Sequence, residues 1–342
     1  MSFKNIQKIP SPEEMQALVP LADNLKEIKA ARDAEIRKIA ENASDKFLVI
    51  VGPCSADEEN AVCDYVYRLA EVQEKVKDKL LLVPRIYTNK PRTTGEGYKG
   101  MLHQPDPESE PNMVDGILSI RRMHVRAIAE SGLTAADEML YPDNYVFVED
   151  MLSYIAVGAR SVENQQHRLT ASGMHLPVGM KNPTSGDLTV MYNSISAAQA
   201  SHHFIYQGHE VETSGNPLAH AIMRGSVNKH GEAIPNYHYE DLISAAEMYA
   251  ARGLVNPMIV VDTNHSNSKK QFKQQIRIAK EIMHSRRHNS DVRAIVRGLM
   301  IESYIEEGAQ KVSEHVYGKS ITDACLGWTD TEQLLYAIAD SV

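Results

Sequence analysis

The sequence predicts a single (β/α)8 TIM barrel of the α/β class, preceded by an N-terminal helical extension. From residue 47 onward, eight short apolar runs alternate with longer stretches of helical periodicity. Most of these runs are apolar throughout, which is typical of parallel strands covered on both faces. Eight such alternations favour a closed barrel over a doubly wound sheet.

The expected strands follow one another through a barrel domain that we place at residues 46–342. They are 47–51, 80–86, 133–137, 154–158, 177–181, 203–206, 258–261 and 294–301. Helical patterns separate them, among others at 59–75, 114–130, 194–199, 239–252 and 269–286. No linker rich in glycine, proline or serine interrupts this region, so one domain is expected.

Residues 1–45 have a different pattern and are expected to form the extension. Ser11 is followed by Pro12 and two glutamates, which indicates a helix with Ser11 as N-cap and proline at its first position. A charged amphipathic helix is expected over 25–40. The extension has no apolar core of its own, so it packs either on the barrel or on a neighbouring subunit, or it stays solvated.

The composition indicates a cytoplasmic enzyme that acts on small metabolites. The 342 residues carry a formal net charge of −9, which argues against nucleic acid or an anionic membrane as the main partner. The first ten residues lack the pattern of a signal peptide, and no apolar run approaches the roughly 20 residues that span a bilayer. The three cysteines are too few for a disulfide framework.

The most informative local feature is the stretch Lys-Pro-Arg-Thr-Thr at 90–94, just after the apolar run 80–87. Together with Arg85, it concentrates three cations within eight residues of an acidic protein. Charge of this sign at the end of a buried strand predicts a site for a phosphorylated substrate. A solvated turn is the alternative for this stretch alone, but similar cations recur at the ends of later strands.

In a TIM barrel the active site lies at the C-terminal ends of the strands, so the residues found there are the candidates. Six of them are cations, namely Arg85, Lys90, Arg92, Arg160, Lys181 and Arg224. Six cations exceed what one phosphate requires and suit two anionic substrates bound side by side. Four others could hold a divalent metal, namely Cys54, His265, Glu302 and Asp323. Each of these four could also be purely structural, but their shared place at the barrel mouth favours a metal site.

Seven motifs in these regions resemble signatures of the type I 3-deoxy-D-arabino-heptulosonate 7-phosphate (DAHP) synthases. They are Gly-Pro-Cys-Ser at 52–55, Lys-Pro-Arg-Thr-Thr at 90–94, Gly-Ala-Arg at 158–160, Gly-Met-Lys-Asn at 179–182, Thr-Ser-Gly-Asn at 213–216, His-Ser-Asn-Ser at 265–268 and Tyr-Gly-Lys-Ser-Ile-Thr-Asp-Ala-Cys at 317–325. They occur in the order of the family and extend over nearly the whole chain. The last motif and Lys-Pro-Arg-Thr are the most specific.

The resemblance implies a transferase that condenses phosphoenolpyruvate (PEP) with erythrose 4-phosphate and water. The products are DAHP and inorganic phosphate, at the first step of the shikimate pathway to the aromatic amino acids. The resemblance assigns a divalent metal, Mn²⁺ before Fe²⁺, Co²⁺ or Zn²⁺, to Cys54, His265, Glu302 and Asp323. It assigns PEP to Arg85, Lys90, Arg160, Lys181 and Arg224. Arg92 and Thr93 would bind the phosphate of the aldose.

The expected chemistry agrees with these roles. A metal can polarise the aldehyde oxygen as a Lewis acid while C3 of PEP attacks the aldehyde carbon. Lys90 is expected to donate a proton to the nascent alkoxide. Water then adds at C2, and Glu138 and Asp262 are the candidates for handling that water. Members of the family are usually dimers or tetramers, so a homodimer or homotetramer is expected.

Four segments depart from the family pattern, and one of them, 95–100, is one residue longer than the common pattern. The usual Asp-x-Ser-His-Ala-Asn reads Asp-Thr-Asn-His-Ser-Asn at 262–267, which keeps His265 but changes its neighbours. The usual Gly-Pro-Cys-Ser-Ile-His reads Gly-Pro-Cys-Ser-Ala-Asp at 52–57. The segment 204–212 is short where many members carry a longer hairpin that helps to bind an aromatic amino-acid inhibitor. We therefore expect feedback control that is weak or altered in specificity.

Three other functions are compatible with parts of the sequence. A related synthase that uses arabinose 5-phosphate would carry Lys-Ala-Asn-Arg in place of the Lys-Pro-Arg found at 90–92. A Schiff-base aldolase would use Lys181 as its nucleophile. An inactive barrel that serves as an interaction partner would have lost a metal donor or a phosphate-binding cation, and the sequence shows no such loss.

Overall fold

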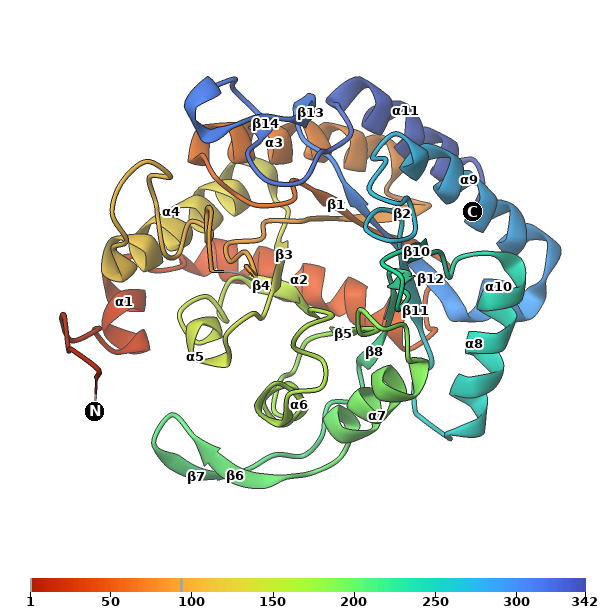
Figure 1. Ribbon diagram of the computed structural model, residues 1–342, viewed down its shortest axis with the longest axis horizontal. Helices are drawn as coiled ribbons and strands as arrows, with labels where there is room; N and C mark the ends of the chain where they lie inside the picture. Colours follow the sequence, from red (N-terminus) through yellow and green to blue (C-terminus); the bar gives the residue numbers. More distant parts are fainter. Residues whose placement is uncertain (1, 93–94) are drawn as a thin grey trace.

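The computed structural model describes residues 2–92 and 95–342, and it contains a barrel of eight parallel strands. The strands are β1 (Phe47–Gly52), β2 (Leu80–Pro84), β3 (Ala135–Glu138), β4 (Leu152–Val157), β5 (Val178–Lys181), β8 (Ala219–Met223), β11 (Ile259–Asp262) and β12 (Val296–Glu302). Each strand lies beside the next one along the chain, and β12 pairs with β1. A parallel bridge between Arg85 and Ala136 closes the ring between β2 and β3. The TIM-barrel prediction is therefore confirmed (Figure 1).

Helices surround the strands and cover the outer face of the barrel (Figure 1). They are α3 (Glu59–Val76), α4 (Met113–Ser131), α5 (Pro142–Tyr145), α6 (Gln165–Ser172), α7 (Leu188–Gln199), α8 (Tyr239–Ala251), α9 (Gln274–His288), α10 (Ser290–Ile295) and α11 (Trp328–Ala339). Every residue of β1, β4, β8 and β12 is buried, as expected for strands between a helix layer and a filled barrel interior. No helix in the described part of the chain is both long and apolar enough to cross a membrane.

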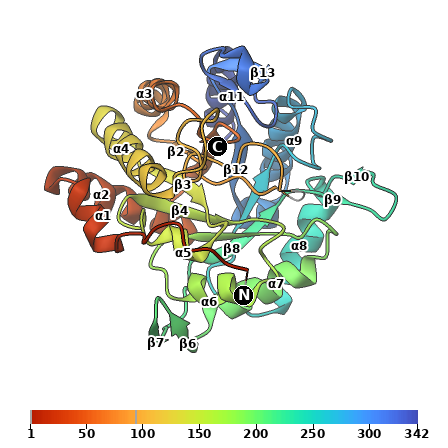
Figure 2. The same cartoon turned by 60° about the vertical axis from the view of Figure 1, so that its left-hand side comes forward.

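Residues 203–206 form a strand as predicted, but their assignment as the sixth strand of the barrel is wrong. This segment is β6 (His203–Tyr206), which pairs antiparallel with β7 (His209–Glu212) in a hairpin that projects from the barrel (Figures 1 and 2). Gln207 and Gly208 turn the chain, with φ of 49° and 76°, as a two-residue hairpin turn requires. The sixth barrel strand is instead β8. Its Ala-His-Ala-Ile-Met sequence has weak strand propensity, but both of its faces are buried.

The other small elements lie at the barrel mouth. The strands β9 (Ser226–Val227) and β10 (Ala233–Ile234) form an antiparallel pair between β8 and α8. After β12, the chain continues through β13 (Glu306–Ala309), a 3-10 turn (Val312–Glu314) and β14 (Lys319–Ser320) before it enters α11. This last excursion carries Asp323 back to the mouth.

The extension consists of α1 (Pro12–Leu18) and α2 (Asp23–Ala40), and it packs on the barrel. Ser11 caps α1 as predicted, because its hydroxyl accepts the Glu14 amide while the Glu14 carboxylate accepts the Ser11 amide. Ile36 and Ile39 of α2 are buried in one cluster with Leu48, at the start of β1. Arg297 also donates to the carbonyl of Ile39 at 2.9 Å. The helix α2 therefore closes the barrel at the N-terminal ends of the strands.

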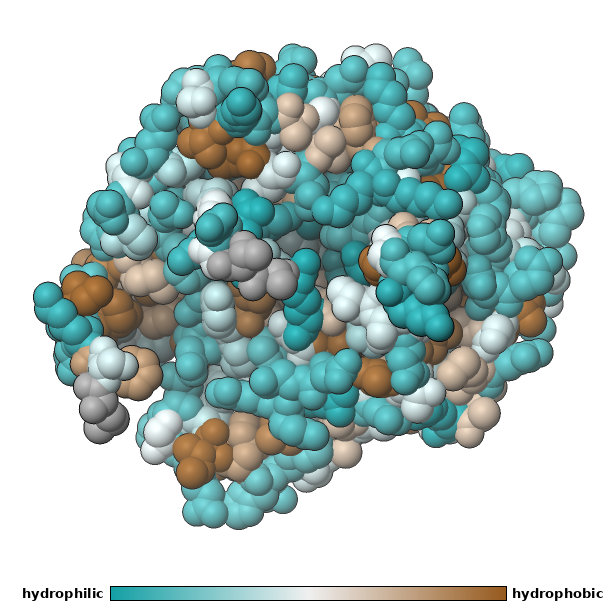
Figure 3. Space-filling view, viewed as in Figure 1, coloured by the Kyte–Doolittle hydropathy of each residue, from teal (hydrophilic) through white to brown (hydrophobic). Residues whose placement is uncertain are grey.

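The opposite end of the barrel is open and polar. Figure 3 shows hydrophilic side chains gathered around a hollow near the centre of the face that Figure 1 presents. The C-terminal ends of the strands meet there, which is the place where TIM barrels bind their substrates.

Candidate active site

A cavity of about 170 Å³ opens at the C-terminal ends of the strands. All six predicted cations line it, namely Arg85, Lys90, Arg92, Arg160, Lys181 and Arg224. The predicted residues Cys54, Glu138, His265 and Asp323 line it as well. Glu302 lines a smaller adjoining cavity that shares His265 and Asp323 with the first, while Asp262 lies fully buried beneath. Thr93 lies outside the described residues.

Arg85 forms the floor of the cavity and is almost fully buried. Its guanidinium lies over the Tyr87 ring, with 3.9 Å to the ring centroid. Its Nη1 lies 2.8 Å from Oε1 of Glu302, and its Nη2 donates to the carbonyl of Cys54 at 3.3 Å. A buried carboxylate needs such a partner, since burial alone would favour its neutral form. Burial opposes ionisation of Glu302, but Arg85 and His265 outweigh it and lower the pKa of this carboxyl.

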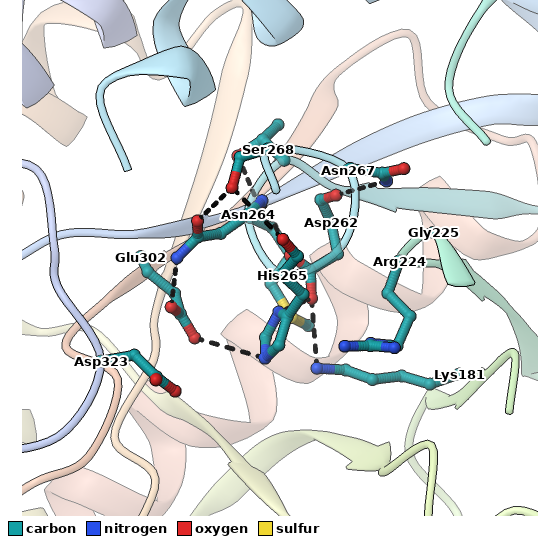
Figure 4. Close-up of polar contacts among 12 residues, drawn as sticks. Lys181, Arg224, Gly225, Asp262, Asn264, His265, Asn267, Ser268, Glu302 and Asp323 are labelled. Atoms are coloured by element: carbon teal, nitrogen blue, oxygen red, sulfur yellow. Dashed lines mark hydrogen bonds and ion pairs between the residues drawn. The ribbon is translucent and has the colours of Figure 1, made fainter. Parts of the chain in front are cut away.

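Asp262, at the end of β11, holds two other site residues in place. Its Oδ2 lies 3.2 Å from Nζ of Lys181 and 2.8 Å from Nδ1 of His265 (Figure 4). Burial would raise the pKa of Asp262, but the charges of His265 and Lys181 outweigh it and hold the pKa well below its usual range. With Nδ1 facing Asp262, the other ring nitrogen of His265 lies 3.8 Å from Oε1 of Glu302.

Cys54, Lys90 and Asp323 form a second cluster. Nζ of Lys90 lies 2.5 Å from Sγ of Cys54 and 3.1 Å from Oδ2 of Asp323, and Sγ lies 3.4 Å from the same Oδ2. Burial opposes ionisation of Asp323, but Lys90 and Lys270 outweigh it and lower the pKa of this carboxyl. Burial, reinforced by the charge of Glu302, raises the pKa of the Cys54 thiol.

The loop that carries Lys90 and Arg92 is fastened to β3 by the buried Asp137. Asp137 accepts the Thr88 amide at 3.0 Å, the Thr88 hydroxyl and the Glu138 amide at 2.7 Å. Burial raises the pKa of Asp137 to about 7, although the Thr88 hydrogen bonds partly oppose that rise. Within the loop, Nε of Arg92 donates to the carbonyl of Tyr98 at 2.8 Å, and the rest of the guanidinium lines the cavity.

Glu138 reaches the cavity through space left free by a glycine. A Cβ atom placed on Gly158 would lie 2.2 Å from Oε1 of Glu138, so any other residue at this position would force the Glu138 carboxylate to move. The Gly-Ala-Arg motif at 158–160 therefore does two things. It brings Arg160 to the rim, and it leaves the Glu138 carboxylate room at the end of β3.

Two further residues join the site that reasoning from the sequence did not assign to it. Lys270 lines both cavities and lies 3.4 Å from Oδ1 of Asp323. Asn264 donates from Nδ2 to Oε2 of Glu302 at 2.5 Å (Figure 4). Their closeness in sequence to His265 was the available signal. His265, Lys269 and Lys270 all have positive φ, between 49° and 60°, a backbone strain that collects at functional sites.

A larger cavity of about 650 Å³ lies away from the mouth, beside the β6–β7 hairpin. Phe204, Tyr206 and Val211 of the hairpin line it, together with Lys29 and Asp33 of α2. The segment 204–212 is therefore long enough to form the wall of a pocket. The expected weak or altered feedback control stays a prediction.

Comparisons with known proteins agree on one family. The model of the DAHP synthetase I family matches residues 24–336. The chain is 37% identical over 350 residues to the Phe-sensitive phospho-2-dehydro-3-deoxyheptonate aldolase of Escherichia coli K12, and the match covers 100% of this chain and 97% of that protein. It is 36% identical over 345 residues to the phospho-2-dehydro-3-deoxyheptonate aldolase of Haemophilus influenzae, with 98% and 90% covered.

Two more relatives extend this result. The Trp-sensitive enzyme of Escherichia coli K12 is 34% identical over 345 residues, and the match covers 98% of this chain and 96% of that protein. The solved structure of phospho-2-dehydro-3-deoxyheptonate aldolase from Francisella tularensis SCHU S4 superposes with a TM-score of 0.92 at 29% identity, covering 100% of this chain and 98% of that one. The chain thus belongs to the DAHP synthetase I family.

Proposed function

We infer that this chain catalyses the reaction of its family, the condensation of PEP with erythrose 4-phosphate and water to give DAHP and inorganic phosphate. This is the first step of aromatic amino-acid biosynthesis. The observation that carries the inference is the convergence of six cations on one small cavity in a chain that matches the family over residues 24–336. Two phosphorylated substrates need that much positive charge.

We assign the two substrates to different sides of the cavity. PEP is held by the cations that follow β2, β4, β5 and β8, namely Arg85, Lys90, Arg160, Lys181 and Arg224. Arg224 is buried beside Arg160, and burial lowers the pKa of its guanidinium, so an anion there is strongly favoured. Arg92 binds the phosphate of the aldose, and Thr93 is proposed to assist it.

The same mouth is proposed to hold a divalent metal on Cys54, His265, Glu302 and Asp323. Among the described residues, no three such donors yet surround one point, but they meet in two close pairs, Cys54 with Asp323 and His265 with Glu302. A thiolate, an imidazole and two carboxylates suit a transition metal, with Mn²⁺ proposed before Fe²⁺, Co²⁺ or Zn²⁺. Asp262, 2.8 Å from Nδ1 of His265, is placed to orient the imidazole, as a carboxylate commonly does for a metal-binding histidine. When bound, the metal supplies Lewis-acid polarisation of the aldehyde oxygen.

The chain's own residues handle the protons. Lys90 lies between the two proposed substrate positions and donates a proton to the alkoxide that forms on the aldose. Glu138, held free by Gly158, is the group proposed to take the proton of the attacking water. Asp262 is a poor base because His265 and Lys181 hold its pKa well below the usual range, so its proposed part is to orient these two side chains.

The same contacts argue against a Schiff-base aldolase. Nζ of Lys181 is ion-paired with Asp262 at 3.2 Å in a buried setting. An ammonium group held in this way is not a nucleophile. The cytoplasmic location stays a prediction. The homodimer or homotetramer is also a prediction, and light scattering on the purified protein would measure the assembly.

The larger cavity supports a regulatory role. We propose that it binds an aromatic amino acid, since tyrosine, phenylalanine and valine side chains line it beside charged groups of α2. Relatives of this chain are named Phe-sensitive and Trp-sensitive.

The reaction is tested by measuring phosphate release from PEP with erythrose 4-phosphate or arabinose 5-phosphate, with and without EDTA. We expect release with erythrose 4-phosphate alone, abolished by EDTA and restored by Mn²⁺. Turnover with arabinose 5-phosphate would contradict the substrate assignment. Full activity of metal-free enzyme, or trapping of a substrate on Lys181 by borohydride, would contradict the proposed chemistry.

A further inference from the structure

Asn264 sits at the centre of a hydrogen-bond chain that ends on Glu302. Ser268 Oγ donates to Oδ1 of Asn264 at 2.6 Å, and Nδ2 of Asn264 donates to Oε2 of Glu302 at 2.5 Å (Figure 4). The Asn264 amide nitrogen of the backbone donates to Oδ1 of Asp262 at 3.0 Å. Asn264, Ser268 and Glu302 are at most 4% exposed, so this chain is shielded from water. It connects the two segments that carry His265 and Glu302.

The two oxygens of Glu302 have different surroundings as a result. Oε2 is taken by Asn264, whereas Oε1 makes no hydrogen bond within the described part of the chain. Oε1 is ion-paired with Arg85, at 2.8 Å to Nη1, and lies 3.8 Å from Nε2 of His265. The backbone of Glu302 is fixed as well, because Gln275 bonds both its amide and its carbonyl, each at 2.9 Å. The carboxylate therefore cannot turn without breaking the bond to Asn264.

We propose that Asn264 is a positioning residue that makes Glu302 a one-oxygen metal ligand, through Oε1, and thereby sets the affinity and coordination geometry of the metal site. The inference rests on the proposed function, in which Glu302 is a ligand. A carboxylate free to rotate can offer both oxygens, as in flexible calcium sites, whereas a single fixed oxygen suits the shorter bonds of transition metals. Hydrogen bonds to ligands of this kind are worth about 10- to 100-fold in metal affinity.

The side chain at 264 has the length and the polarity that this role requires. A serine in its place carries one oxygen close to the backbone and cannot bridge to both Ser268 and Glu302. An aspartate keeps the length but sets a second carboxylate against Glu302, which is repulsive in a buried place. Ser268 selects the orientation of the amide, since its hydroxyl donates to the oxygen and so turns the nitrogen toward Glu302.

The test is metal binding to metal-free protein, measured by isothermal titration with Mn²⁺ and by the visible spectrum with Co²⁺. We expect one metal per chain in the wild type. Asn264→Ala and Asn264→Asp should bind Mn²⁺ 10- to 100-fold more weakly and shift the Co²⁺ absorption bands, and Ser268→Ala should weaken binding by a smaller factor. Ser266→Ala is the matched control, because Ser266 is buried in the same loop and is expected to change neither affinity nor spectrum.

Thermal melting of the metal-free variants shows that they fold. Folded Asn264→Ala and Asn264→Asp that keep the wild-type affinity and Co²⁺ spectrum would overturn the inference while leaving the metal site itself intact. A wild-type protein that binds neither Mn²⁺ nor Co²⁺ would overturn the proposed metal site and the inference with it. An Asn264→Ser variant that keeps the wild-type affinity would show that the side chain at 264 need not reach from Ser268 to Glu302. That result would also overturn the inference.

Discussion

Nζ of Lys90 lies 2.5 Å from Sγ of Cys54, although the two residues are 36 positions apart in the chain. One was expected to bind substrate and the other to bind metal. Their contact, together with the 3.1 Å approach of Lys90 to Asp323, means that the proposed metal ligands and the proposed proton donor form one cluster. Changes at Lys90 therefore act on the centre of the reaction rather than on its periphery.

Lys90→Met should lower kcat by roughly 10²- to 10⁴-fold, the usual contribution of a general acid. Lys270→Met is the matched control, because Lys270 also pairs with Asp323 but its side chain is 72% exposed. An exposed ion pair contributes about 0–1 kcal/mol, so kcat of the control should fall less than about tenfold. Steady-state kinetics with folded, metal-loaded variants measure both. Equal losses in the two variants would contradict the assignment of Lys90.

Phosphate recognition should be separable between the substrates. Arg92→Ala should mainly raise the KM for erythrose 4-phosphate, and Arg160→Ala should mainly raise the KM for PEP. Loss of one charge-assisted hydrogen bond costs about 1.5–3 kcal/mol, which is roughly 10- to 150-fold. Kinetics with one substrate varied at a time measure the two effects. If each variant impairs both KM values equally, the division of the cavity is wrong.

Gly158→Ala should displace the Glu138 carboxylate, because the new Cβ would lie 2.2 Å from its Oε1. The side chain can swing away, so we expect a loss of kcat with little change in thermal stability. Combining Gly158→Ala with Glu138→Ala measures whether the two act through the same group. The double variant should be no slower than Glu138→Ala alone, and additive losses would show that Gly158 acts elsewhere.

Stability should fall with rising pH through the titration of Asp137. The pKa of this carboxyl is about 7 in the folded protein, against about 3.9 in an unfolded chain. The folded protein thus retains a proton that the unfolded chain releases. The contribution of this proton to the free energy of unfolding is complete below pH 4 and is lost as the pH rises through 7. The slope is at most about 1.4 kcal/mol per pH unit.

Urea unfolding of wild type and Asp137→Asn at pH 5 and pH 8 isolates this effect, since other groups titrate alike in both proteins. The wild type should lose more stability than the variant between these two pH values. Parallel pH profiles would show that Asp137 is already ionised in the folded protein.

Phenylalanine, tyrosine and tryptophan should be titrated separately at sub-saturating substrate, and one of them is expected to inhibit. A ligand alters activity only if it binds two states of the protein unequally, so binding should be measured alongside inhibition. Val211→Trp fills the larger cavity from the hairpin and should raise the inhibitory concentration at least tenfold. Ile205→Trp is the control on the same hairpin, because Ile205 is 77% exposed and does not line the cavity. Identical behaviour of the two variants, or no inhibition at all, would contradict a regulatory site there.

The fold class and seven of the eight barrel strands could be predicted from the sequence, because strands buried on both faces leave near-continuous apolar runs. The remaining strand, which is the sixth of the barrel, could not be predicted. His-Phe-Ile-Tyr at 203–206 has stronger strand propensity than Ala-His-Ala-Ile-Met at 219–223, yet the first is a projecting hairpin and the second lies in the barrel. Propensity reports local fit to an extended backbone, whereas burial on both faces is decided by neighbours that are distant in sequence.

The candidate site shows the same division. The sequence by itself determined which chemical groups the chain offers and, through the rule that barrel sites lie at the C-terminal strand ends, that they gather at one mouth. Tertiary structure alone decided which groups touch. Asn264 meets Glu302 across 38 residues and Lys181 meets Asp262 across 81, because strands far apart in the chain end at the same barrel mouth. These contacts decide that Asp262 pairs with Lys181, and that one oxygen of Glu302 accepts from Asn264 while the other faces Arg85 and His265. Charge and hydrogen bonding depend on distances that no local pattern encodes.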